Sequence, residues 1–187
     1  MFAMPVVSYA RIISGVAAVL MLSLAAAVQA NDKAELVASS QQALVKLRGH
    51  ASGAGPLLDK AAGVLVYPEV VKVGFGGAAE YGEGCLLVDG KAVAFFSTSG
   101  ATYGLPLGAG VKSEVLLFMT AQALQDFRAS QTWKVGVDGD VVMVRVASGG
   151  GVDATSISEP IVGFVFSDKG LESKLTLADG KFTRIAR

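Results

Sequence analysis

The sequence has few cysteines and histidines and no excess of charge of either sign. Its 187 residues include one cysteine, Cys85, and one histidine, and its 16 basic residues are balanced by 16 acidic ones. A single cysteine cannot form an intramolecular disulfide, so packing must stabilise the fold. A nucleic-acid partner would call for a clustered positive field, which this charge balance does not supply. We therefore expect no nucleic-acid binding.

The residue groupings that most catalytic and metal sites need are also missing. The histidine, His50, lies in a Gly/Ser-rich segment, and no nucleophile-elbow motif accompanies it. Cys85 heads an apolar run, where a thiol packs as a small hydrophobic group. Glu80 and Glu83 are three residues apart in a β-rich region, where this spacing places them on opposite faces. The sequence contains neither the ligand spacing of a zinc site nor the motif of a calcium-binding loop. We expect no catalysis, no metal and no cofactor.

The longest hydrophobic run lies within the first thirty residues. Arg11 is the only charged residue there, and the apolar run from Ile12 to Val28 ends in Val28-Gln29-Ala30, a pattern typical of a cleaved secretory signal. The run is shorter than the roughly 20 residues of a spanning helix, which would be the alternative. We expect a signal peptide at residues 1–30, one domain at residues 31–187 and a periplasmic location.

The periodicity of the remaining sequence changes near Gly63. Asp32 to Leu47 has apolar residues at helical spacing, and Pro56 to Ala62 predicts a short helical turn. Thr120 to Ser130 predicts a third helix with Thr120 as its N-cap. The other β-rich runs predict strands at Val64–Tyr67, Lys72–Tyr81, Cys85–Val88, Ala92–Thr98, Val115–Met119, Val141–Ala147, Ile161–Phe166, Leu171–Leu177 and Phe182–Ile185.

Three Asp-Gly pairs separate predicted strands: Asp89-Gly90, Asp138-Gly139 and Asp179-Gly180. Asp-Gly between apolar runs predicts a type I′ hairpin, because both central residues of that turn need a positive φ. Hairpins imply antiparallel pairing. We therefore predict an α+β fold, a single domain of antiparallel β-hairpins with a few helices.

The stretch from Val73 to Ala79 contains G-x-G-x-x-A, the spacing of a dinucleotide-binding turn. Such a turn needs a helix directly after the glycines, but the following residues contain Gly82 and Gly84 and lead into the strand at Cys85. We therefore assign these glycines to the fold, as sites of a bend, a bulge or a close approach between chain segments.

An ordered series of motifs extends from about Leu57 to Arg187. Its segments are Gly63 to Gly77, Glu80 to Gly84, Lys112 to Thr120, Trp133 to Gly139 and Pro160 to Ser167. Together they resemble the SYLF domain family, and its bacterial exported members in particular. The resemblance implies an α+β fold of two intertwined BON-like units and a lipid-binding function. Eukaryotic relatives bind phosphoinositide membranes, and fungal relatives contact actin.

The resemblance leaves the lipid head group open for two reasons. Bacterial envelopes generally lack phosphoinositides and actin, and this chain lacks a strongly basic N-terminal helix. A peripheral lipid binder needs apolar side chains at the acyl boundary and cations for the phosphates. Four basic residues lie beside apolar ones in the first part of the domain: Lys46, Arg48, Lys60 and Lys72. The alternative for each of them is a solvated surface charge. We predict non-catalytic binding of anionic phospholipid, or a related amphiphile, in the bacterial cell envelope, with these four residues as candidates.

A structural or interaction protein of the envelope is the second hypothesis. The glycine-rich segments from Ser99 to Gly110 and from Ser148 to Gly151 would offer sheet edges to a protein partner.

Overall fold

The structure is a computed structural model, and it describes residues 32–74, 77–103, 110–144, 158–168, 170–171 and 180–187. The chain divides into two compact units, Met1–Glu35 and Leu36–Arg187. The predicted signal segment, residues 104–109 and residues 148–151 lie outside the described ranges. Within those ranges, no helix is long and apolar enough to cross a membrane.

Helical segments precede the sheet and interrupt it once. The hydroxyl of Thr120 accepts a hydrogen bond of 3.1 Å from the N–H of Ala123, so this residue caps the third helix as predicted. The elements in chain order are a helix at residues 32–50, α2 (Ala54–Lys60), β1 (Gly63–Gly74), β2 (Gly77–Val88), β3 (Lys91–Tyr103), β4 (Gly110–Phe118), α3 (Ala121–Ala129), β5 (Thr132–Lys134), β6 (Val142–Met143), β7 (Ile161–Ser167), β8 (Gly170–Leu171) and β9 (Lys181–Ile185).

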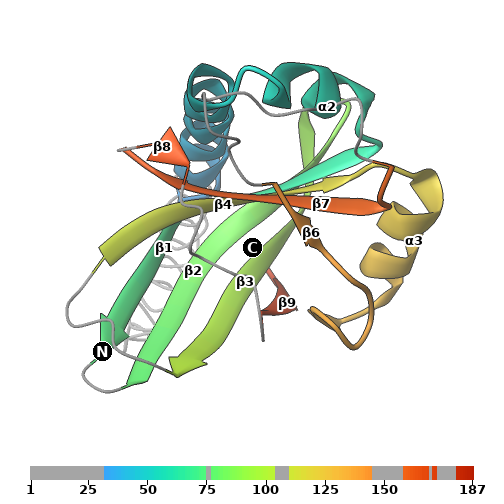
Figure 1. The fold of residues 1–187 in the computed structure, drawn as a ribbon. Helices are drawn as coiled ribbons and strands as arrows, with labels where there is room; N and C mark the ends of the chain where they lie inside the picture. The colour runs from blue at the N-terminus through green and yellow to red at the C-terminus, as the bar shows by residue number, and fades with distance from the viewer. Residues whose placement is uncertain (1–31, 75–76, 104–109, 145–157, 169, 172–179) are drawn as a thin grey trace, which may run out of the picture. The chain divides into compact units, whose positions relative to one another are not determined.

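The described strands form one nine-stranded sheet in the order β5-β9-β3-β2-β1-β4-β7-β6, with β8 paired to β7. Every pair is antiparallel except β6 with β7. The four strands that precede α3 occupy the centre, and the strands that follow α3 flank them on both sides (Figure 1). The predicted α+β class, with one domain of antiparallel hairpins and a few helices, is confirmed.

The sheet has two buried faces, because successive side chains of a strand point to opposite sides. In β1, Val64 and Val66 pack under the helix at residues 32–50 and α2, whereas Leu65 and Tyr67 pack on the other side, where α3 lies. We call these the helical face and the aromatic face of the sheet.

On the helical face, Ala43 and Leu47 of the first helix and Leu57 of α2 belong to the same buried cluster as Cys85 of β2. Cys85 is fully buried, as predicted, and its burial raises the pKa of the thiol, an effect that the Ser40 hydroxyl only partly opposes. The thiol therefore stays protonated and packs as a small hydrophobic group.

On the aromatic face, rings from distant parts of the chain surround Phe127 of α3. Its ring centroid lies 4.8 Å from that of Phe118, 4.9 Å from that of Phe96 and 5.8 Å from that of Trp133. Offset and tilted ring pairs at such distances are favourable beyond the area they bury. This cluster joins α3 to the central strands.

The first hairpin differs from the prediction at two places. Lys72–Tyr81 was predicted as one strand, but β1 ends at Gly74 and β2 begins at Gly77, and Gly76 lies outside the described residues. In addition, β1 continues through Pro68, where the register with β2 shifts between Val66 and Glu69. Proline has no N–H for the ladder, so a bulge accommodates it. A strand follows the glycines, so the helix that a dinucleotide turn requires is absent at this position.

Only part of the Asp-Gly prediction holds. Asp89 and Gly90 both have positive φ, 50° and 73°, and they connect β2 to β3 as a hairpin. The prediction of a hairpin at Asp138-Gly139 is wrong. There Gly136 takes the positive φ, and the Asp138 carboxylate accepts a 2.8 Å hydrogen bond from the N–H of Lys134. Asp138 therefore closes a local turn instead of a two-residue hairpin. Asp179 lies outside the described residues.

Gly84 permits a close approach between β1 and β2. A Cβ at this position would lie 2.2 Å from the carbonyl oxygen of Val66 and 2.6 Å from the Tyr67 ring. Because the nearer atom belongs to the backbone, Gly84→Ala should destabilise the protein by about 1–3 kcal/mol. Gly110→Ala is the matched control, since nothing lies within 4 Å of its Cβ position. Urea denaturation measures both variants, and equal unfolding free energies would contradict the packing described here.

Candidate functional site

Two of the four predicted lipid-binding residues lie near the end of the first helix. The ammonium of Lys46 is 2.8 Å from the Asp168 carboxylate, and the guanidinium of Arg48 is 2.7 Å from the Asp59 carboxylate. The side chains of Lys46 and Arg48 remain 54% and 47% exposed. Exposed ion pairs contribute only about 0–1 kcal/mol, so both cations can exchange their partners.

Lys60 occupies the last turn of α2, directly after Asp59, and is exposed. The Arg48–Asp59 contact joins the end of the first helix to the last turn of α2, which carries Lys60. Three of the four predicted residues, Lys46, Arg48 and Lys60, thus belong to the helical layer. We call them the basic surface group.

Lys72 does not share this surface. It lies in β1 two residues after Val70, which is buried on the aromatic face, so the two side chains point to the same side of the sheet. Its side chain is 15% exposed and its ammonium is 3.7 Å from the Glu80 carboxylate. The sheet separates Lys72 from the basic surface group.

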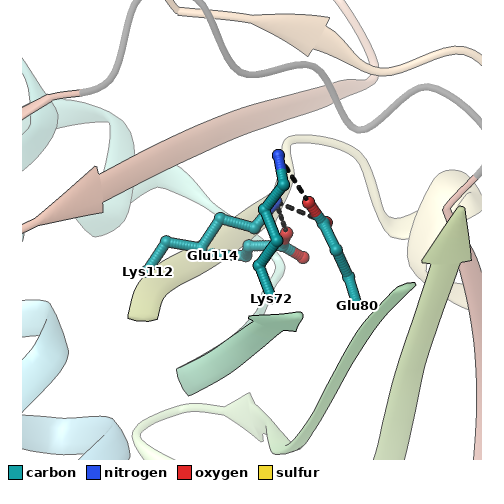
Figure 2. Close-up of polar contacts among 4 residues, drawn as sticks. All are labelled: Lys72, Glu80, Lys112 and Glu114. Atoms are coloured by element: carbon teal, nitrogen blue, oxygen red, sulfur yellow. Dashed lines mark hydrogen bonds and ion pairs between the residues drawn. The ribbon is translucent and has the colours of Figure 1, made fainter. Parts of the chain in front are cut away.

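Lys72 and Glu80 form the outer part of a four-residue ionic cluster that also contains Lys112 and Glu114 of β4 (Figure 2). The Lys112 ammonium donates to Glu80 at 2.6 Å and contacts Glu114 at 2.9 Å. Exposure of the side chains falls from 15% at Lys72 and 12% at Glu80 to 6% at Lys112 and 2% at Glu114. The cluster therefore has an outer end and a buried end.

Strand register explains why these four side chains meet. Lys72 is the cross-strand partner of Glu80, and Lys112 is the partner of Val70. Glu114 lies opposite Tyr67, whose ring is stacked 5.6 Å from Phe182 of the aromatic cluster. The ionic cluster thus continues the aromatic face along the same strands, and Tyr67 stands at the boundary between them.

The buried end of the cluster is incompletely satisfied. The Tyr67 hydroxyl and one carboxylate oxygen of Glu114, Oε2, are buried and have no hydrogen-bond partner within the described part of the chain. A buried polar atom without a partner costs about 1–3 kcal/mol. Native structures contain few such atoms, and each calls for a physical explanation.

The surroundings change the pKa values of Glu114, Lys112 and Tyr67. Burial raises the pKa of Glu114 above its ordinary value, and the Lys112 charge only partly offsets this effect. Burial acts to lower the pKa of Lys112, but the carboxylates of Glu114 and Glu80 outweigh it, so that pKa is raised. Burial, and then the Glu114 charge, raise the pKa of Tyr67. Lys112 and Tyr67 are therefore protonated at neutral pH.

Lys112 and Glu114, the inner half of the cluster, are not among the residues that the sequence predicts for a binding site. The strand at Val115–Met119 was predicted to begin after Glu114, although Lys112, Glu114, Leu116 and Phe118 alternate on one face of β4. That alternation was the available signal. Glu80 and Glu83 have different partners, as expected for opposite faces, since Glu83 pairs with Arg187.

The environment of His50 differs from the predicted loop. It is the last helical residue of the first helix, and its ring centroid is 6.1 Å from that of Phe166. His50 is only partly exposed, and the helix continues three residues beyond the predicted end at Leu47. This ring contact gives His50 a packing role.

Comparison with known proteins adds no relative. Neither a scan against models of protein families nor a search of curated proteins finds a match. The SYLF resemblance and the lipid-binding function therefore remain predictions from the sequence.

Among the described residues, no group of three or more His, Cys, Asp and Glu side chains could hold a metal ion.

The raised pKa of Glu114 predicts a specific pH effect on stability. A raised folded-state pKa contributes stability that is fully present below the ordinary value of 4.5 and is lost as pH rises through the folded value. Glu114→Gln removes this contribution. Between about pH 4.5 and pH 7.5, the wild type should lose this contribution, so its unfolding free energy should fall relative to that of the variant. Denaturant titrations across this range measure the unfolding free energies of both proteins. Parallel pH profiles of the wild type and the variant would contradict a raised pKa of Glu114.

Proposed function

We propose that this protein binds anionic phospholipid, or a related anionic amphiphile, at a membrane surface of the bacterial envelope, without catalysis. The basic surface group supplies the phosphate contacts, and the solvent-facing side of the first helix lies against the lipid. The observation that carries the proposal is the charge pattern of the part of that helix that belongs to the unit Leu36–Arg187.

From Leu36 to His50 the helix has two cationic side chains, Lys46 and Arg48, and no acidic residue. Leu47 is buried, so Lys46 and Arg48 lie about 100° to either side of it, and Val45 lies about 160° away. Val45 is 71% exposed. An apolar side chain flanked by two long cations suits the interface between head groups and acyl chains, where the cations reach the phosphates.

Neutral residues surround Lys46 on this side of the helix. Ala38, Gln41, Gln42, Val45 and Lys46 line an open hollow at its surface. No carboxylate among these lining residues would repel an anionic head group. The two carboxylates that pair with the basic surface group, Asp59 and Asp168, have side chains 68% and 87% exposed, and phosphate oxygens can replace them without leaving a buried charge.

Charge reversal of the basic surface group tests this proposal. Each basic residue near an anionic surface contributes about 1 kcal/mol, so the triple variant Lys46→Glu, Arg48→Glu and Lys60→Glu should bind vesicles at least about 100-fold more weakly. Co-flotation with phosphatidylglycerol vesicles at low salt measures this, and phosphatidylcholine vesicles should not bind either protein.

The matched control reverses three exposed lysines outside the helical layer, Lys91, Lys134 and Lys181. It changes the net charge by the same amount, so loss of binding in this control as well would indicate a non-specific charge effect. No flotation of the wild type with any anionic vesicle would refute the proposal and favour a protein partner.

A further inference from the structure

The ionic cluster on the aromatic face has hydrogen-bonding capacity that the described chain does not use. The Lys72 ammonium is 3.7 Å from its Glu80 partner, beyond hydrogen-bond distance, and it makes no hydrogen bond to the described residues. Glu114 Oε2 and the Tyr67 hydroxyl are unpaired as well. Lys72 and Tyr67 belong to β1, and Glu114 belongs to β4. A chain of ionic contacts joins Lys72 to Glu114: Lys72 contacts Glu80, Glu80 contacts Lys112, and Lys112 contacts Glu114.

We infer that this cluster is a binding site for a singly charged phosphate group, held by the Lys72 ammonium, the Tyr67 hydroxyl and a protonated Glu114 carboxyl. A phosphate diester has only acceptor oxygens to offer, so it needs donors. Lys72 and Tyr67 supply donors directly, and Glu114 supplies one once it carries a proton. This inference does not rest on the proposed vesicle binding, which uses the opposite face of the sheet.

Charge balance favours an anion. With Glu114 ionised, the two lysines and two carboxylates of the cluster sum to zero, and with Glu114 protonated the cluster carries one net positive charge. A bound anion would then restore neutrality in a place that excludes most solvent. Burial raises the pKa of Glu114 despite the opposing Lys112 charge, so this carboxyl takes up a proton more readily than an exposed glutamate. Anion binding and proton uptake by Glu114 are therefore linked.

The groups around Glu114 support this assignment. Tyr67 and Lys72 approach from β1, Glu80 from β2 and Lys112 from β4, while the β7 residue in register with Glu114 is the apolar Val165. Among them, Lys112 already donates to Glu80 and contacts Glu114. Lys72, at the outer end of the cluster, is the cation with donors to spare.

Isothermal titration calorimetry with dimethyl phosphate tests the inference, since this diester keeps one negative charge between about pH 5 and pH 8. The protein is purified after expression of the full-length chain. We expect one binding site, with affinity rising as pH falls. Lys72→Met should weaken binding at least about tenfold, because it removes a charge-assisted donor. Tyr67→Phe should weaken it less, and the exposed control Lys91→Met should not change it.

Glu114→Gln separates this inference from a purely structural role of the cluster. Glutamine keeps a donor without ionising, so this variant should bind dimethyl phosphate with an affinity that no longer depends on pH. Titration with inorganic phosphate and with short-chain phosphatidylglycerol below its micelle concentration distinguishes a free anion from a lipid head group. The inference fails if the folded wild type binds none of the three probes, or if Lys72→Met binds them unchanged.

Discussion

The alternation of side chains along β1, β2 and β4 is the constraint on which the rest of the structure depends. These central strands are buried on both faces, so each residue is committed to one of two environments by its position alone. Near α3 the aromatic face is filled by rings, and farther along the same strands it carries Lys72, Glu80, Lys112 and Glu114. Charges placed on an inward face cannot reach solvent freely, and they must therefore neutralise one another.

Stability does not explain why the cluster is charged. Replacing a buried ion pair by well-packed apolar side chains is often neutral or stabilising, because desolvation of the ions offsets their attraction. Here the balance is less favourable still, since Glu114 and Tyr67 each leave a buried polar atom unpaired. An apolar strand face would continue the aromatic cluster at lower cost. The ionic side chains therefore fit a binding role better than a purely structural one.

Local patterns were sufficient to predict much of the fold, but not the cluster. The first helix, the capped α3 and the Asp89-Gly90 hairpin depend on residues close in sequence, and each was predicted. Lys112 and Glu114 meet Lys72 only through the β1–β4 register, which no local signal specifies. Lys72 and Lys46 both adjoin apolar residues, which predicts a common surface for them. In a strand, however, the immediate neighbour, here Val71, faces the opposite side of the sheet from Lys72.

The two sets of cations differ in how strongly water and salt affect them. Lys46 and Arg48 are about half exposed, and at physiological ionic strength their field is screened within about 8 Å. Lys112 and Lys72 are largely enclosed, so salt screens them much less. The net charge of their cluster changes instead when Glu114 takes up or releases a proton. Contacts at the helical face should therefore weaken with salt, whereas contacts within the ionic cluster should depend chiefly on pH. A protein with both would hold a membrane surface reversibly and one anionic group more selectively.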